Sequence, residues 1–169
     1  MSKKHRGSQP GAATPALLAL DKAGVAHEVL TYEHSDRSTT GFGQEAAAKL
    51  AVDPDLALKT LLVGDGDQVG ACVLPVSHRL SLKHAAKALG MKKAALIPPA
   101  DAERITGSVV GGISPLGLKR RMSVVVDASV EHAASVIVSG GRRGVSVRLA
   151  PADLATVAQA SFAPLEAQD

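Results

Sequence analysis

Residues 59–76 read KTLLVGDGDQVGACVLPV, and this stretch decides the fold. Two apolar runs, residues 60–63 and 69–76, flank the turn-forming segment 64–67 (Gly-Asp-Gly-Asp). Short apolar runs on either side of Gly and Asp indicate a β-hairpin. Cys72, the single cysteine, falls inside the second run. We therefore interpret it as a buried strand residue that forms no internal disulfide.

Helices and further strands are expected on both sides of the hairpin. Thr14 and Pro15 suit the cap and first residue of a helix that Gly24 ends, while Ser81 caps a helix that Gly90 ends. The periodicity also predicts helices over residues 44–50, 99–105 and 151–160, and strands over residues 25–32, 92–96, 109–110, 124–126, 136–138 and 145–149. Helices so few and short favour an α+β (mixed α/β) fold with a curved, largely antiparallel or mixed sheet.

The chain of 169 residues is expected to form one domain, residues 13–169, after a disordered basic tail, residues 1–12. The tail is either simply solvated or a weak electrostatic arm for RNA. It has no apolar segment of the kind found in signal peptides, and no run approaches the roughly 20 apolar residues of a membrane helix. The expected compartment is therefore the cytoplasm. The net charge of +3 allows a polyanionic partner without requiring one.

Several functional classes are disfavoured by composition. Aromatic residues make up only 2% of the chain, so a platform that stacks bases is not expected. No Gly-x-Ser-x-Gly elbow, P-loop or His-Glu-x-x-His motif is present, and no Cys/His spacing matches a zinc site. We therefore expect no metal and no cofactor. The six scattered histidines are interpreted as surface residues: His5, His27, His34, His78, His84 and His132.

Two glycine-rich segments and one lysine are the candidates for chemistry. Residues 110–117 read VGGISPLG and residues 138–144 read VSGGRRG. Paired glycines let backbone N–H groups approach a ligand, so the two segments form either a nest for an oxyanion or carboxyl group, or two tight turns. Lys59, at the start of the apolar strand, either orients a carbonyl or phosphate or is a surface lysine. Basic residues near these segments make an RNA or phosphate surface plausible: Lys83, Lys87, Lys92, Lys93, Lys119, Arg120, Arg121, Arg142, Arg143 and Arg148.

These motifs, in this order, resemble the YbaK/EbsC family of aminoacyl-tRNA deacylases, which is similar to the editing insertion domain of bacterial prolyl-tRNA synthetases. The resemblance runs from about Thr14 to Phe162. Its motifs are TPA (14–16), TYEH (31–34), FGQE (42–45), KTLLV (59–63), KHAAK (83–87), GGISPLG (111–117) and VSGGRRG (138–144). The Cys-tRNA(Pro) deacylases are the most similar group. The resemblance implies a mixed sheet curved into a partial barrel with flanking helices.

The resemblance also implies a set of site residues. The expected catalytic residues are Lys59, Gly111 and Ser139. The expected substrate-binding residues are Tyr32, Phe42, Thr60, Gly112, Ile113, Ser114, Gly140 and Gly141. Lys59 is expected to hold the terminal ribose or phosphate of the tRNA, and Gly111 to orient the ester carbonyl. Ser108 and Leu118 depart from the family pattern beside the glycine loop, and we expect them to bear on pocket shape.

The implied function is trans-editing, the hydrolysis of mischarged aminoacyl-tRNA, above all Cys-tRNA(Pro). The substrate's own thiol is expected to attack the ester, which makes the reaction lyase-like through cyclisation. Mischarged tRNA(Pro) and, transiently, prolyl-tRNA synthetase are the implied partners. The alternatives are a non-catalytic module that binds tRNA or a synthetase, and a deacylase for another amino acid, such as one acting on Ala-tRNA(Pro). A weaker alternative is a protein that binds a small molecule or a nucleotide.

Overall fold

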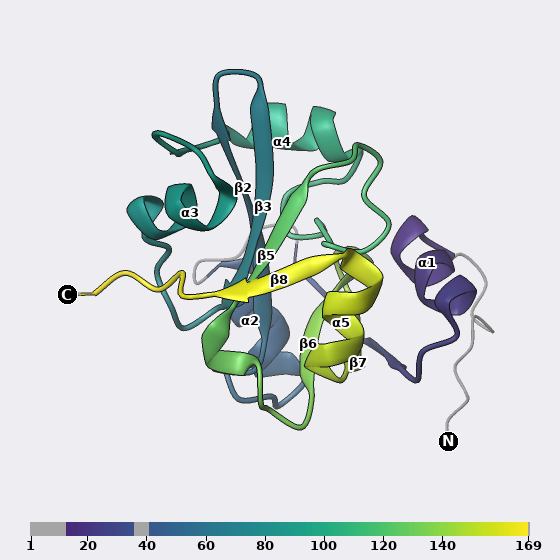
Figure 1. Cartoon of the computed structure of the whole chain (residues 1–169). Coiled ribbons are helices and arrows are strands. Elements are labelled where there is room, and N and C mark those ends of the chain that lie inside the picture. Colours follow the sequence, from purple (N-terminus) through teal and green to yellow (C-terminus); the bar gives the residue numbers. More distant parts are fainter. Residues whose placement is uncertain (1–12, 36–40, 169) are drawn as a thin grey trace.

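The computed structural model describes residues 13–35 and 41–168, which form two β-sheets with helices packed around them (Figure 1). The α+β fold class expected from the sequence is confirmed. The expected basic tail, residues 1–12, lies outside the described residues, as do residues 36–40. No helix in the described part of the chain is long and apolar enough to cross a membrane.

The larger sheet has five strands in the order β4-β2-β3-β5-β8. The hairpin expected from the sequence forms its centre, as β2 (Leu58–Asp65) and β3 (Gln68–Pro75). Strand β4 (Ala95–Leu96) pairs antiparallel with β2, whereas β5 (Ser123–Asp127) runs parallel to β3 and β8 (Ala160–Ala163) parallel to β5. The sheet is therefore mixed, as expected, although β8 was not predicted.

The smaller sheet has three antiparallel strands in the order β1-β7-β6. These strands are β1 (Glu28–Thr31), β6 (Val136–Arg142) and β7 (Val145–Leu149). A bridge between Ala57 and Ile137, with the Ile137 N–H donating to the Leu56 carbonyl at 2.9 Å, joins the two sheets. The sheets meet there without closing into a barrel, so the expected single curved sheet is in fact two.

The first helix and the helix after the hairpin begin and end where their caps predict. The Thr14 hydroxyl accepts a hydrogen bond from the Leu17 N–H in α1 (Pro15–Ala23), and Gly24 ends that helix at φ 70°. In α3 (Leu82–Leu89), Ser81 is the matching cap. The other helices are α2 (Phe42–Lys49), α4 (Pro99–Thr106), α5 (Pro151–Ala158) and a 3₁₀ turn (Ala128–Val130).

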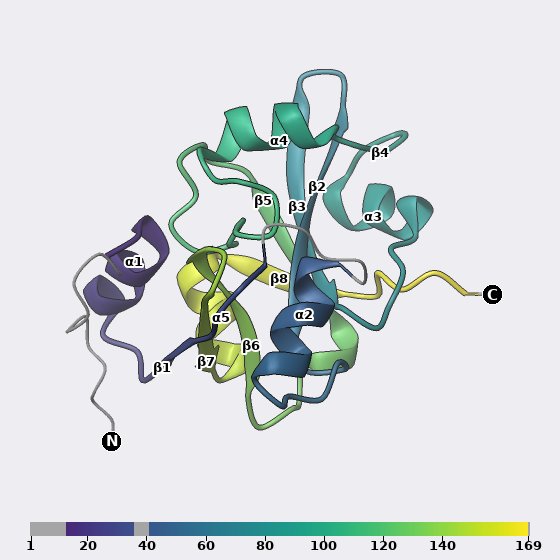
Figure 2. The same ribbon diagram turned by 180° about the vertical axis from the view of Figure 1, so that it is seen from behind.

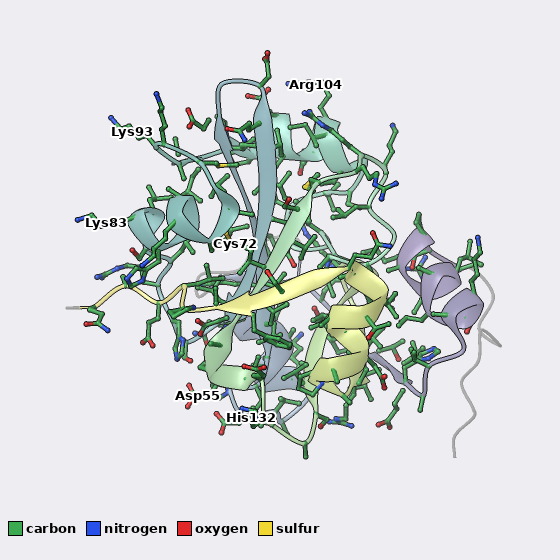
Figure 3. All side chains as sticks on the ribbon, in the orientation of Figure 1. Asp55, Cys72, Lys83, Lys93, Arg104 and His132 are labelled. Atoms are coloured by element: carbon green, nitrogen blue, oxygen red, sulfur yellow. The ribbon has the colours of Figure 1, made fainter. Side chains whose placement is uncertain are left out.

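The core is built from aliphatic side chains, as the low aromatic content requires. One cluster joins α1 and α5 to the facing sides of both sheets, a second lies under α3, and a third lies under α2. Cys72 belongs to the second cluster and has no exposed surface. Figure 3 shows Cys72 near the centre of the molecule, whereas Lys83, Lys93 and Arg104 point outward. The buried-strand interpretation of Cys72 is confirmed.

Two local predictions were wrong. Residues 109–110 form no strand but enter the turn that holds Gly111. Gly140 and Gly141 do not lie in a loop after β6 but within β6 itself, at an irregularity between Ser139 and Arg142. A β-bulge of this kind accommodates an extra residue in one strand, and glycine tolerates the unusual backbone it needs. Gly141 accordingly has φ 108°.

Candidate active site

A cleft of about 410 Å³ opens beside the Ala57–Ile137 bridge, where the two sheets meet. Figure 2 shows α2 and α4, which both contribute to its walls, on the near side of the sheets. The lining is mainly apolar, and within the described residues its ionisable side chains are Tyr32 and Lys59. An apolar cleft with a few polar groups is typical of a small-molecule site.

Lys59, the second residue of β2, lines this cleft. Its ammonium Nζ donates a hydrogen bond to the main-chain carbonyl of His78 at 2.7 Å. An ammonium has three N–H donors, so two remain for a ligand. Partial burial lowers the pKa of Lys59 from its usual value of 10.5, because the charged form loses solvation. Lys59 is thus a partly buried cation in an apolar cleft, which favours its interpretation as a site residue over that as a surface lysine.

Gly111 lies at the edge of the cleft in a turn that α4 holds in place. The Val110 N–H donates to the Glu103 carboxylate of α4 at 2.7 Å, and the Gly112 N–H donates to the Val109 carbonyl at 2.8 Å. Gly111 itself has φ 92°, a conformation that favours glycine. Its N–H donates no hydrogen bond to any residue that the structure describes. Gly111 thus lines the cleft with an N–H that has no acceptor among the described residues.

Arg143 and Phe42 pack directly over Gly111. The Arg143 guanidinium lies 3.9 Å from the centre of the Phe42 ring, and its Nε donates to the Val110 carbonyl at 2.8 Å. A Cβ on Gly111 would lie 2.6 Å from the Phe42 ring and 2.9 Å from Arg143 Nε. The site therefore admits no side chain at position 111.

Two serines face each other across β6 and β7. Ser139 and Ser146 are paired in the register, and both line the cleft. The Ser139 Oγ accepts a hydrogen bond from the Gly141 N–H at 3.1 Å, so its own proton can be donated to a ligand. Ser146 was not among the residues expected from the sequence. It follows Ser139 by seven residues, and only the pairing of the two strands brings the hydroxyls together.

The other expected residues that line the cleft come from separate elements. Tyr32, Phe42, Thr60 and Ile113 all contribute to the wall. The Tyr32 N–H donates to the Gly144 carbonyl at 3.0 Å, which ties the end of β1 to the turn after β6. Burial raises the pKa of the Tyr32 hydroxyl, which remains a neutral donor near neutral pH.

Gly112 and Ser114 do not line the cleft. A Cβ on Gly112 would lie 2.7 Å from the Arg142 Cα, so this glycine permits close backbone packing. Ser114 is buried, and its Oγ accepts a hydrogen bond from the Leu116 N–H at 3.2 Å. Both residues shape the glycine loop and are not placed to contact a ligand.

Gly140 and Gly141 also lie outside the lining and contact the start of α1. The Thr14 hydroxyl donates to the Gly140 carbonyl at 2.5 Å. A Cβ on Gly141 would lie 2.9 Å from the Thr14 Cβ. The second glycine pair therefore anchors the first helix to β6. Of the four glycines in the two pairs, only Gly111 lines the cleft, so the two pairs do not form a nest there together.

Ser108 and Leu118, which depart from the family pattern, do not line the cleft either. The Ser108 N–H donates to the Thr106 hydroxyl at 3.2 Å, which closes the end of α4. Leu118 packs against the main core cluster. Both residues support the loop between them from outside the cleft, and their effect on pocket shape stays a prediction.

One apolar wall of the cleft was not found by sequence reasoning. It consists of Leu96, Ile97, Pro98, Pro99 and Ala102. Leu96 is about half exposed, at 53%, because it stands at the rim. No motif marks this segment, and its contribution depends on the pairing of β4 with β2, with Val63 opposite Leu96.

The arrangement suits stabilisation of an oxyanion. Lys59, the Gly111 N–H and the two serine hydroxyls are donors at one cleft, and donors fixed in place stabilise charge that develops in a transition state. Cys72 is sealed in the sheet, and burial raises the pKa of its thiol to about 12, so it is no nucleophile. Among the described residues, no group of three His, Cys, Asp or Glu side chains is placed to hold a metal ion.

Comparison with known proteins places the site in context. Residues 37–157 match the family model described as "Aminoacyl-tRNA editing domain". The chain is 31% identical over 127 residues to "Putative Cys-tRNA(Pro)/Cys-tRNA(Cys) deacylase EbsC" of Enterococcus faecalis, which covers 75% of this chain and 77% of that protein. It is 29% identical over 112 residues to "Uncharacterized protein YwhH" of Bacillus subtilis, over 66% of this chain and 71% of the relative.

Two solved structures share the fold. A crystal structure described as "a putative trans-editing enzyme for prolyl tRNA synthetase" superposes with a TM-score of 0.82 at 22% identity, over 95% of this chain and 100% of the other. The crystal structure of "hypothetical protein APE2540" superposes with a TM-score of 0.79 at 26% identity, over 91% and 100% of the two chains.

Proposed function

Because the chain belongs to the family of aminoacyl-tRNA editing domains and acts as an aminoacyl-tRNA deacylase, we propose that its substrate is Cys-tRNA(Pro), deacylated in trans. Support for the amino acid comes from the relative of Enterococcus faecalis, whose name specifies Cys-tRNA(Pro) and Cys-tRNA(Cys). Support for the reaction comes from the cleft, which offers donors for a carbonyl oxygen and, among the described residues that line it, no cysteine thiol to attack the ester.

The observation that carries the proposal is the ammonium of Lys59, held in an apolar cleft beside Gly111 and Ser139. An aminoacyl ester is already activated, so its cleavage requires positioning and oxyanion stabilisation more than a strong protein nucleophile. In our proposal Lys59 binds the terminal ribose or phosphate of the tRNA. The Gly111 N–H and the Ser139 hydroxyl donate to the ester carbonyl.

The proposed nucleophile is the thiolate of the substrate cysteine. It attacks its own ester carbonyl, so that a carbon–sulfur bond forms and the ester carbon–oxygen bond breaks. The ribose hydroxyl of the tRNA leaves with a proton taken from water. The product is a four-membered cyclic thioester, which water then opens to free cysteine. The first step is a cyclisation and the sum of the two steps is a hydrolysis.

The test is single-turnover deacylation of Cys-tRNA(Pro) and Ser-tRNA(Pro) across a range of pH. Cysteine and serine differ in one atom, but a hydroxyl has a far higher pKa than a thiol. We expect Cys-tRNA(Pro) to be cleaved and Ser-tRNA(Pro) to be nearly inert at neutral pH. Equal rates would mean that water or an enzyme group attacks, and the thiol mechanism would be abandoned.

Ala-tRNA(Pro) is a second candidate substrate, because the wall formed by Leu96, Ile97 and Ala102 suits a small apolar side chain. Adding Ala-tRNA(Pro) and Pro-tRNA(Pro) to the panel distinguishes the candidates. Release of alanine faster than cysteine would make the protein an alanine editor. A protein that binds all these tRNAs and releases no amino acid would be the non-catalytic module.

We also propose that the protein works in the cytoplasm beside prolyl-tRNA synthetase, the enzyme that makes the mischarged substrate. The support is the name of the trans-editing structure with the same fold. Size-exclusion chromatography of the two proteins with and without tRNA(Pro) tests this association. Separate elution under both conditions would contradict it.

A further inference from the structure

Asp127, at the end of β5, is a buried carboxylate that the proposed chemistry does not use. Only 2% of this residue is exposed. Its Oδ1 accepts a hydrogen bond from the Leu165 N–H at 2.9 Å, and its Oδ2 accepts one from the Ser129 hydroxyl at 2.6 Å. A buried carboxylate is costly unless its contacts compensate for lost solvation.

The side chain of His78 faces Asp127. Its Nδ1 lies 3.4 Å from the Asp127 Oδ2 and 3.5 Å from the Glu166 Oε1. This nitrogen is buried and makes no hydrogen bond of standard geometry, so the two carboxylates are its polar surroundings. Only 16% of the His78 side chain is exposed, and the interpretation of this histidine as a surface residue is wrong.

The backbone of His78 connects this pair to the cleft. The His78 carbonyl is the acceptor for the Lys59 ammonium at 2.7 Å. A lysine side chain has four rotatable bonds and loses much conformational freedom when it is fixed. An acceptor that is itself immobile reduces the number of positions open to the ammonium. The position of the His78 backbone therefore decides where the charge of Lys59 lies.

The segment after β8 holds the same loop from outside. The Ser81 N–H donates to the Leu165 carbonyl at 2.8 Å, and the Ala167 N–H donates to the Arg79 carbonyl at 2.7 Å. Residues 165–167 thus run antiparallel to residues 79–81, with a bridge between Leu80 and Glu166. His78 lies at the end of this pairing, between the carboxylates of Asp127 and Glu166.

We propose that Asp127 and His78 are positioning residues for deacylation, because they fix the main-chain carbonyl that holds the ammonium of Lys59 in the cleft. This inference rests on the proposed role of Lys59. In this proposal the buried carboxylate of Asp127 acts on Lys59 indirectly, because it holds the loop of residues 76–80 in place. Neither side chain lines the cleft, so neither contacts the substrate.

The test compares three substitutions of His78 in single-turnover assays with saturating Cys-tRNA(Pro). His78→Ala removes the contact with Asp127, and we expect the maximal rate to fall about tenfold. The amide nitrogen of His78→Asn occupies roughly the place of Nδ1 and should restore most of the rate. The longer His78→Gln should not. His84→Ala is the matched control, since His84 Nδ1 contacts the Glu166 carbonyl at 3.1 Å without contacting Asp127.

A second measurement separates positioning from plain stability. Competitive acetylation of the free enzyme across pH, read by peptide mass spectrometry, gives the pH at which the Lys59 amine becomes reactive. In His78→Ala this midpoint should move to lower pH, because the main-chain carbonyl of residue 78 is no longer held in place and favours the charged form of the amine less. Asp127→Asn, if it folds, should shift the midpoint in the same direction.

A folded His78→Ala that keeps the wild-type rate overturns the proposal. A loss of rate with an unchanged Lys59 midpoint overturns it too, since His78 would then act by another route. The failure of the proposed function looks different. In that case Lys59→Ala itself would remain active, whatever the His78 variants do.

Discussion

The guanidinium of Arg143 stacks on the ring of Phe42, 3.9 Å from its centre, and also binds the Val110 carbonyl. One side chain from the turn between β6 and β7 thereby joins α2 to the glycine loop. The loop residue that follows, Gly111, lies beneath this contact. The position of the glycine backbone is therefore coupled to a charge that lies outside the cleft lining.

Arg143→Ala should lower the single-turnover rate about tenfold, because the glycine loop loses its hydrogen bond and the packing over Phe42. A cation–π contact of this kind contributes on the order of 1 kcal/mol. Arg104→Ala is the control: it removes the same charge from an exposed position of α4, where Arg104 pairs with Asp101 at 2.7 Å. Equal losses in the two variants would show that only net charge matters.

Lys59→Ala should abolish measurable deacylation while leaving the fold intact. Removing one electrostatic donor from such a site costs on the order of 10²–10³ in rate. Lys59 is only partly buried and belongs to none of the core clusters, so the melting temperature should change little. Circular dichroism checks that the fold is intact, and single-turnover assays on the same preparation check that activity is lost. A folded variant with near wild-type turnover would remove Lys59 from the mechanism.

Gly111→Ala should reduce turnover far more than stability. The new Cβ would lie 2.6 Å from the Phe42 ring, and the alanine would have to keep the backbone angle of φ 92° that favours glycine. The loop therefore has to move away from the cleft. Gly66→Ala is a matched control, because Gly66 also has a positive φ, at 63°, but open space around it. The Gly66 variant should keep its activity. Comparable losses of activity in both would contradict a specific role for Gly111.

Cys72→Ala should keep full activity and lose about 1 kcal/mol of stability, a common cost for a small buried substitution. The thiol is fully buried, and burial raises its pKa to about 12, so no thiolate forms at neutral pH. Deacylation assays together with urea unfolding test this. Complete loss of turnover in a folded Cys72→Ala protein would point to an enzyme thiol as nucleophile.

The rate should pass through a maximum as pH rises. It first increases as the substrate thiol ionises, near pH 8.5 for an ordinary thiol. It then falls when the Lys59 ammonium loses its proton, and because burial lowers the pKa of Lys59, this loss begins at a lower pH than for an ordinary lysine at 10.5. In Lys59→Arg the falling limb should disappear, since a guanidinium stays charged. A wild-type rate that keeps rising through pH 10.5, after subtraction of spontaneous hydrolysis, would contradict the role of the ammonium.

Local signals predicted the elements whose ends are fixed by neighbouring residues. The helix from Pro15 needs only the Thr14 hydroxyl and the Gly24 backbone, and the hairpin needs only its turn. Strand β8 was missed because Ala160–Ala163 has no pattern of its own. It is a strand because β5, far away in sequence, supplies its hydrogen bonds.

The site was predictable to the extent that motifs carried it. Lys59, Gly111 and Ser139 lie at one cleft, while their catalytic roles, which the family resemblance implies, stay a prediction. Ser146 was missed because only the register of β7 with β6 turns its hydroxyl toward Ser139. His78 was misinterpreted for a similar reason, since its partners come from β5 and from the segment after β8. Such pairings are set by tertiary structure, which the periodicity of one segment does not encode.

The pairing of residues 165–167 with residues 79–81 also has a consequence for biosynthesis. Lys59 leaves the ribosome well before Leu165, the residue that holds Asp127. Domains fold largely as units once their strands are available, and contacts distant in sequence form late. The nascent chain thus contains Lys59 before residues 165–167 are present to hold the loop that positions the ammonium. An editing enzyme built this way becomes competent only after residues 165–167 have been translated.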